Sequence, residues 1–212
     1  MERPKIMEDY CEISFKVYWG FANGMLGGAL VMLGNAMIFH DLPNLASCFI
    51  HLTPCSVTWT MRWFGSEINE AYPGIFCLPS SEKTSDSFDD ILFPTLKFYF
   101  IWLAIYSMYM IPYGIHLGSS NEAVKNGQWD TAYAYTIRNV AIIQKVCGKN
   151  PASLSTYVNF MSCHAISAMI LCSLSFMLWN NFYAHTAYCM VLFMIATYNG
   201  SVRYVNMMTK WY

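Results

Sequence analysis

The chain alternates between long apolar segments and polar stretches that hold most of its charged residues. Residues 17–39 contain no Asp, Glu, Lys or Arg. At 1.5 Å per residue, a helix of this length crosses a hydrocarbon core of about 30 Å. Read in the same way, the whole pattern predicts about five transmembrane helices, over residues 16–39, 44–61, 91–117, 157–179 and 182–198.

Two polar stretches, residues 65–90 and 119–156, are predicted to be soluble loops. Within the second, residues Asp130 to Val146 have a helical pattern, which predicts one amphipathic helix lying in the membrane interface. We therefore expect an all-α fold, a polytopic membrane helix bundle that forms a single domain over residues 1–212. The apolar stripe expected on the interfacial helix consists of Ala132, Tyr135, Val140, Ile143 and Val146.

Composition supports a membrane protein, because 56% of the residues are hydrophobic and only 12% are charged. A soluble domain carries about a quarter charged residues. The net charge of −1 gives no basic patch for nucleic acid. The first 16 residues mix acids with bases, unlike a signal or transit peptide, so the first span is expected to be retained as its own insertion signal.

The eight cysteines occur singly, without a Cys-x-x-Cys pair or a cysteine–histidine cluster. This spacing predicts neither a zinc site nor a disulfide framework. The sequence also lacks a phosphate-cradling glycine loop and the motifs of the serine hydrolases and zinc proteases. No cofactor is expected.

Glycine residues recur at four-residue spacing in the first apolar segment, at Gly20, Gly24 and Gly28. Such a face allows another helix to approach closely. Residues 40–44 then turn the chain, and Asn44 is predicted to cap the second helix.

The second apolar segment is unusually polar, with His51 near its middle and Pro54 one turn later. A helix of this kind faces protein or a water-filled cavity rather than lipid. Neutral imidazole accepts protons near pH 7, although His51 would equally serve as a hydrogen-bond partner of a neighbouring helix. Arg62 lies eleven residues further on and shares its face if the helix continues past Pro54.

Other polar residues near segment ends have two interpretations each. His40 is either an interfacial residue or a catalytic one. Arg62 either binds a phosphate or anchors its helix at the interface. Asn199 and Arg203 lie one turn apart and either form a second polar cluster or simply close their helix.

Several motifs resemble those of the glycerophosphocholine acyltransferases. Asn35 to His40, the segment Ser47-Cys48-Phe49-Ile50-His51-Leu52-Thr53-Pro54, and Arg62-Trp63 follow one another as in that family. Tyr198 to Tyr204 is similar to the family's Trp-Asn-Gly-Gly-x-x-Tyr element, with Tyr198 in place of the first Trp. Family members have further spans before the first motif, so the resemblance implies a shortened, divergent member without the N-terminal spans.

The resemblance implies acyl transfer from acyl-CoA to a hydroxyl of glycerophosphocholine, which gives lysophosphatidylcholine and CoA. Acyl-CoA would be a substrate, so no cofactor is implied. In such a reaction His51 or His40 would take the hydroxyl proton, and Asn35 would donate to the developing oxyanion. The residues expected to bind substrate are Arg62 at a phosphate, Trp59 or Tyr109 at the choline, and Asn199 with Arg203 as a second polar cluster.

The alternative is a non-catalytic accessory subunit of a large membrane complex, derived from that family and retained for helix packing and contacts with lipids. The enzyme would lie in the endoplasmic reticulum. The accessory subunit would lie among other membrane subunits in the mitochondrial inner membrane or another organellar membrane. The two hypotheses differ in whether the polar groups around His51 still perform chemistry.

Overall fold

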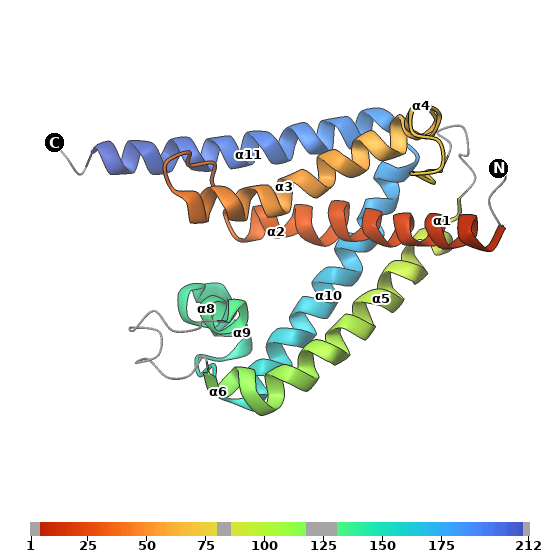
Figure 1. Ribbon diagram of the computed structural model, residues 1–212. Coiled ribbons are helices and arrows are strands. Elements are labelled where there is room, and N and C mark those ends of the chain that lie inside the picture. The colour runs from red at the N-terminus through yellow and green to blue at the C-terminus, as the bar shows by residue number, and fades with distance from the viewer. Residues whose placement is uncertain (1–4, 80–85, 118–130, 210–212) are drawn as a thin grey trace. The chain divides into compact units, whose positions relative to one another are not determined.

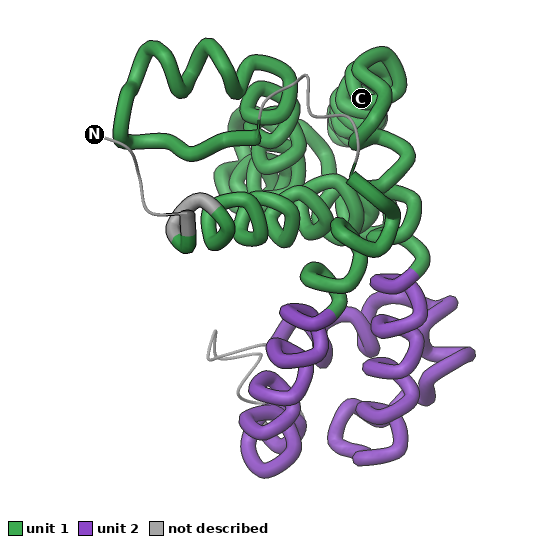
Figure 2. Tube along the Cα trace, turned by 90° about the vertical axis from the view of Figure 1, so that its right-hand side faces the viewer, with its two compact units in different colours: residues 1–96, 170–212 green, residues 97–169 purple. Residues whose placement is uncertain are grey.

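The computed structural model describes residues 5–79, 86–117 and 131–209, and within these ranges it contains helices and no strand (Figure 1). The chain divides into two compact units (Figure 2). The first combines Met1–Leu96 with Ile170–Tyr212, and the second is Lys97–Met169. Helices α5 (Phe88–Tyr109) and α10 (Leu154–Trp179) each contribute residues to both units.

The first apolar segment forms one continuous helical rod: α1 (Lys5–Gly20), the π-helix η1 (Phe21–Leu26) and α2 (Gly27–Met32). The predicted end at Phe39 is wrong, because the helix ends at Met32. Gly34 adopts φ +60°, a left-handed conformation that ends helices and suits glycine. Residues 35–38, which follow, form neither a helix nor a turn.

Helix α3 (Leu42–Trp63) continues through Pro54 without interruption. Its N-cap is Asp41 rather than the predicted Asn44, because the Asp41 carboxylate accepts the backbone N–H of Asn44. This hydrogen bond and a second one from the Asn44 side chain hold the pKa of Asp41 below its usual value.

The predicted glycine face is confirmed within the first unit. A Cβ atom at Gly24 would lie 3.0 Å from the α10 backbone at Leu171 and Cys172, and one at Gly20 would overlap Thr95 of α5. Larger residues at these positions would therefore push α5 and α10 away from the rod.

Helix α11 (Phe182–Met208) follows α10 after a short turn and ends ten residues beyond the predicted position. Helices α2, α3 and α11 enclose one core of the unit, which includes Leu30, Cys48 and Leu192. A second core in the same unit joins Phe15, Trp19, Ile91 and Trp179.

The stretch 65–90 was predicted to be a loop, but it begins with helix α4 (Gly65–Ala71). The Asn69 side chain fixes this helix to the chain that follows. Its amide donates to the carbonyl of Leu78 at 2.9 Å and accepts the Leu78 N–H at 3.1 Å. These two hydrogen bonds hold Leu78 against α4.

In the second unit, α5 continues into the π-helix η2 (Met110–Gly114) and α6 (Ile115–Leu117). The π-helix contains Pro112, which has no backbone N–H to donate. The predicted helix from Asp130 to Val146 is instead two helices, α8 (Ala132–Asn139) and α9 (Ala141–Cys147), and Asp130 lies outside the described residues. Val140 separates them with extended backbone angles.

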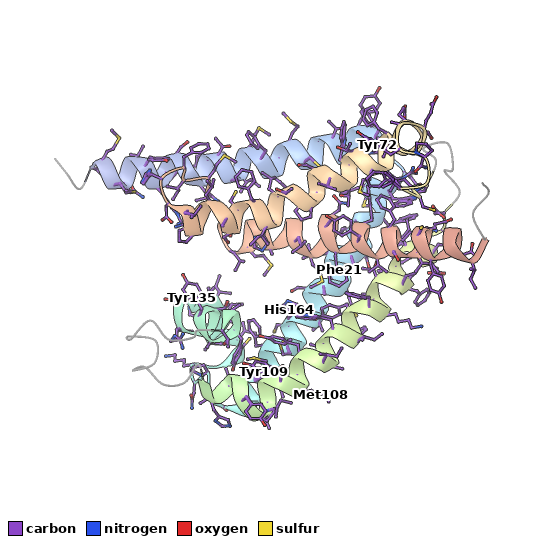
Figure 3. All side chains as sticks on the ribbon, viewed as in Figure 1. Phe21, Tyr72, Met108, Tyr109, Tyr135 and His164 are labelled. Carbon is purple, nitrogen blue, oxygen red and sulfur yellow. The ribbon has the colours of Figure 1, made fainter. Side chains whose placement is uncertain are left out.

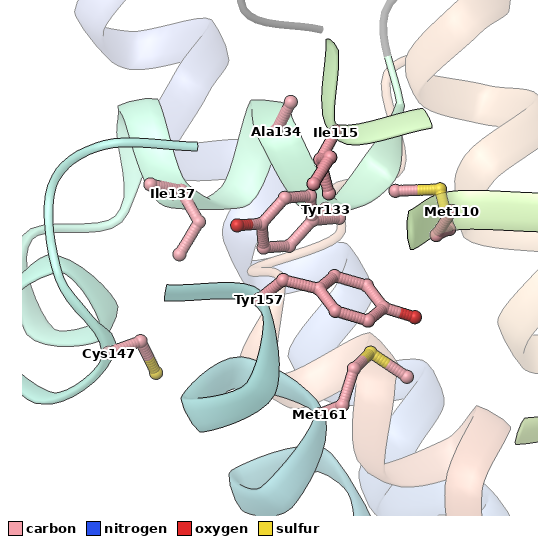
Figure 4. Close-up of a cluster of buried hydrophobic side chains, with 8 residues drawn as sticks. All are labelled: Met110, Ile115, Tyr133, Ala134, Ile137, Cys147, Tyr157 and Met161. Carbon is pink, nitrogen blue, oxygen red and sulfur yellow. The ribbon is translucent and has the colours of Figure 1, made fainter. Parts of the chain in front are cut away.

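The members of the predicted apolar stripe do not share one face, because Ile143 packs inward whereas Tyr135 and Val146 are exposed. Tyr133 and Ile137 are buried, and they meet Tyr157 and Met161 of α10 in a core (Figure 4). Tyr135 and Val146, which belong to the predicted stripe, are exposed, as is Ile142.

Two described helices are long and apolar enough to cross a membrane by length and composition, Phe88–Gly114 and Leu154–Trp179. Only 17% and 22% of their most apolar windows are buried, whereas a core helix of a soluble domain is mostly covered. Exposed side chains such as Met108 and Tyr109 project from α5 (Figure 3). These features favour membrane association, and the count of five spans stays a prediction.

Candidate functional site

The non-helical residues Leu33 to His40 lie against one stretch of α11 in the first unit. Met37 donates its N–H to the carbonyl of Ala196 at 3.0 Å, and the Asn199 amide donates to the carbonyl of Asn35 at 3.0 Å. Gly200 packs directly on the Met37 backbone, where any Cβ atom would overlap the Met37 carbonyl. The small size of Gly200 therefore permits the contact.

The next turn of α11 holds both ends of this segment. Arg203 donates to the Asn44 side-chain oxygen at 2.8 Å and to the Gly34 carbonyl at 3.4 Å. The Tyr204 hydroxyl accepts the N–H of Phe39 at 3.0 Å. These contacts fix the start of the segment and its end.

His40 meets the same hydroxyl, with 3.1 Å between its Nδ1 and the Tyr204 oxygen. Because that oxygen already accepts the Phe39 N–H, its own hydrogen is available to donate to Nδ1. If the hydroxyl donates in this way, neutral His40 carries its proton on Nε2; if Nδ1 carries the proton, it donates to the second lone pair of the hydroxyl. The ring is exposed and packs at 5.1 Å from the Tyr204 ring.

The segment brings the Asn35 side chain to His51 of α3. The Asn35 Nδ2 atom lies 2.8 Å from His51 Nδ1 and 2.9 Å from the Ser47 carbonyl. His51 Nδ1 lies 2.7 Å from the same carbonyl. Thus Asn35, His51 and Asn199 come together, as members of one cluster with Ser47. We refer to these four residues as the Asn35–His51 cluster.

The triangle of contacts leaves two tautomers for His51. The Ser47 carbonyl can only accept and the Asn35 amide nitrogen can only donate, whereas the imidazole nitrogen can do either. If Nδ1 accepts from Asn35, the proton is on Nε2. If Nδ1 donates to the Ser47 carbonyl, Nε2 carries a lone pair and can act as a base.

Arg62 and Trp59, predicted to bind substrate, lie toward the opposite end of α3. Arg62 is about 16 Å from His51 along the helix axis. Its guanidinium is fully buried over the rings of Trp63 and Trp179, at 5.0 and 4.6 Å. Trp59 donates to the Thr186 hydroxyl at 2.9 Å. The structure therefore does not join these two residues to the Asn35–His51 cluster.

A second polar network lies near Arg62 and was missed from the sequence, which gave His185 no role. Trp63 donates to His185 Nδ1 at 3.1 Å, so neutral His185 donates from Nε2 to the Asn23 side-chain oxygen at 2.8 Å. The Asn23 amide donates in turn to Thr58 at 3.0 Å. Every link has a defined direction, which is typical of a structural network in an apolar bundle. The pairing of Asn23 with His185 joins distant helices and leaves no local signal.

His164 has the contacts of a packing residue. It belongs to the second unit, and its Nδ1 lies 2.8 Å from the Tyr99 hydroxyl. The rings of Tyr99, Trp102 and Phe160 surround it at 5.8 to 6.3 Å.

Comparison with known proteins confirms the resemblance to the glycerophosphocholine acyltransferases. Glycerophosphocholine acyltransferase 1 of Saccharomyces cerevisiae is 24% identical over 197 residues, which cover 91% of this chain and 42% of the relative. The protein of the same name from Ricinus communis is 32% identical over 97 residues, which cover 43% of this chain and 25% of the relative. The chain thus spans less than half of the length of these relatives. No family model and no solved structure matches it.

The contact at Gly200 leads to a prediction about stability. In an isolated helix, Gly200→Ala should stabilise α11, because alanine is the better helix former by about 1 kcal/mol. Here the added Cβ meets the Met37 backbone, and we expect overpacking to destabilise the chain by about 1–3 kcal/mol. Thermal unfolding in detergent measures this as a lower Tm. The control is Ser201→Ala at the exposed neighbouring position, which should change Tm little. A Gly200→Ala protein as stable as wild type would contradict the contact.

Proposed function

We propose that this chain is a multi-pass membrane protein that transfers an acyl group from acyl-CoA to glycerophosphocholine, with His51 as the general base. The likeness to two proteins named glycerophosphocholine acyltransferase supports the reaction class. The observation that carries the assignment of His51 is the 2.7 Å contact between its Nδ1 atom and the Ser47 carbonyl, which accepts the Nδ1 hydrogen. This contact holds the ring by one nitrogen and leaves the other for substrate.

The reaction needs one base that later acts as an acid. With its proton on Nδ1, His51 takes the hydroxyl proton of glycerophosphocholine on Nε2, and the oxygen attacks the thioester carbonyl. The tetrahedral intermediate collapses with cleavage of the carbon–sulfur bond. The imidazolium then returns the proton to the departing CoA sulfur, so that lysophosphatidylcholine and CoA are formed and His51 is regenerated.

Asn35 acts differently from the sequence-based prediction, which made it an oxyanion donor. Its amide nitrogen donates to the carbonyl and the hydroxyl of Ser47, and the same carbonyl accepts the Nδ1 hydrogen of the base form of His51. We therefore assign Asn35 as a positioning residue that acts on the imidazole through Ser47. Asn199 supports it through the Asn35 carbonyl. Orientation of a catalytic base within a fraction of an ångström is worth a large factor in rate.

Arg203 replaces Arg62 as the proposed phosphate-binding residue. Arg203 lies one turn from Asn199 on α11 and is exposed, whereas Arg62 is enclosed by tryptophan rings toward the other end of α3. The guanidinium of Arg203 has five N–H donors. Two of its nitrogens hold Asn44 and Gly34, and its remaining hydrogens are available to a phosphodiester.

The base is tested with His51→Asn. The asparagine amide reaches the position of Nδ1 and can still donate to the Ser47 carbonyl, but it cannot take a proton at the position of Nε2. We expect transfer of radiolabelled oleate from oleoyl-CoA to glycerophosphocholine, measured in membranes, to fall at least about a hundredfold. Membrane insertion and Tm should be retained. The matched control, His116→Asn at an exposed position, should keep wild-type turnover.

Wild-type turnover in His51→Asn would rule out the base. If the wild-type chain inserts and folds but transfers no acyl group to glycerophosphocholine, the enzyme proposal itself is contradicted. That result would favour the accessory-subunit alternative.

Arg203 is tested by the Michaelis constant for each substrate. We expect Arg203→Gln to raise KM for glycerophosphocholine about tenfold or more, since a charge-assisted contact with phosphate is lost, and to leave KM for acyl-CoA unchanged. Arg203→Lys should fall between the two, because lysine keeps the charge without the planar fork. An equal rise in both constants would show that Arg203 acts on the fold rather than on the glycerophosphocholine phosphate.

A further inference from the structure

Helix α9 presents two contrasting faces in the second unit. Cys147 and Ile143 turn inward, where Cys147 is buried and Ile143 packs against the core of that unit. Ile142 and Val146, one turn apart on the other side, are 72% and 62% exposed. Lys145 lies between them in sequence and is exposed as well. An aliphatic pair beside a lysine therefore points away from the unit.

The charge around this face has one sign. Residues 131–153 include Arg138, Lys145 and Lys149 and contain no aspartate or glutamate. Helix α4 has the same length but the opposite character, with exposed Glu67 and Glu70. A cationic surface with exposed aliphatic residues matches a partner that is anionic and apolar at once, as is a bilayer containing acidic phospholipids.

The position of α9 places it at one end of a candidate membrane-crossing helix. Only residues 148–153 separate it from α10, whose candidate span begins at Leu154. Asn159 of α10 donates to the Cys147 carbonyl at 3.3 Å, which fixes the end of α9 against the second turn of α10. If α10 crosses a membrane, its first turn lies near the headgroups, and α9 is held at the same level.

We propose that α9 docks on the bilayer surface, with Ile142 and Val146 inserted among the lipids and with Lys145 and Lys149 bound to anionic phospholipid headgroups. This surface belongs to the second unit and is independent of the Asn35–His51 cluster in the first. The proposal gives Lys145 and Lys149 anionic headgroups as partners outside the chain. Two contributions to docking are distinct in this proposal: the aliphatic pair drives insertion into the bilayer, and the lysines determine lipid selectivity.

Hydrogen–deuterium exchange of the full chain in nanodiscs tests the proposal. The backbone amides of residues 141–147 should exchange roughly tenfold more slowly in phosphatidylcholine discs with a third phosphatidylserine than in phosphatidylcholine alone. The amides of residues 65–71 in α4 are the internal control and should not slow. The K145Q/K149Q variant should abolish the difference between the two lipids, and so should high salt. The I142S/V146S variant should speed exchange in both lipids.

Equal exchange of α9 in the two lipid mixtures would overturn the proposal, as would a phosphatidylserine effect that survives K145Q/K149Q. A phosphatidylserine effect of equal size in α4 would also overturn it, because the effect would then be general. None of these measurements depends on acyl transfer, so the outcome is independent of the proposed function.

Discussion

The structure depends on the hydrogen-bond partners of an irregular stretch of backbone, residues 33–40, which lies within an apolar helical unit. A buried N–H or C=O group without a partner costs several kcal/mol in an apolar medium. Helix α11 supplies the partners: Ala196 accepts the Met37 N–H, Asn199 donates to the Asn35 carbonyl, and Tyr204 accepts the Phe39 N–H. Gly200 allows the two backbones to meet.

This pairing explains why residues that are distant in sequence form one cluster. Once α11 holds the carbonyl of Asn35, the side chain of Asn35 reaches Ser47 and His51 on α3. The polar residues of α3 therefore fall into two groups, at different positions along the helix. His51 belongs to the Asn35–His51 cluster, one turn of α11 away from the exposed Arg203, whereas Thr58 and Arg62 lie among the buried residues toward the helix end.

Sequence reasoning identified the helices and most of the polar residues but could not pair them. The glycines of the first helix and the polarity of α3 follow from spacing and residue type, whereas Asn35 was singled out by the resemblance to the acyltransferases. The end of the first helix at Met32 does not, because residues up to Phe39 are as apolar as a helix requires and only Gly34 marks the break. The reach of Asn23 to His185 and of Tyr204 to Phe39 depends on tertiary packing, which leaves no local pattern in either partner.

The central claim is that α11 acts on His51 through Asn35, and a double-mutant cycle tests it most directly. Acyl transfer is measured for Asn199→Ala, Asn35→Ala and the double variant. If Asn199 serves to place the Asn35 amide beside His51, then Asn199→Ala slows transfer in the wild-type background and costs little further once Asn35 is alanine. Rate losses that simply multiply in the double variant would contradict the claim.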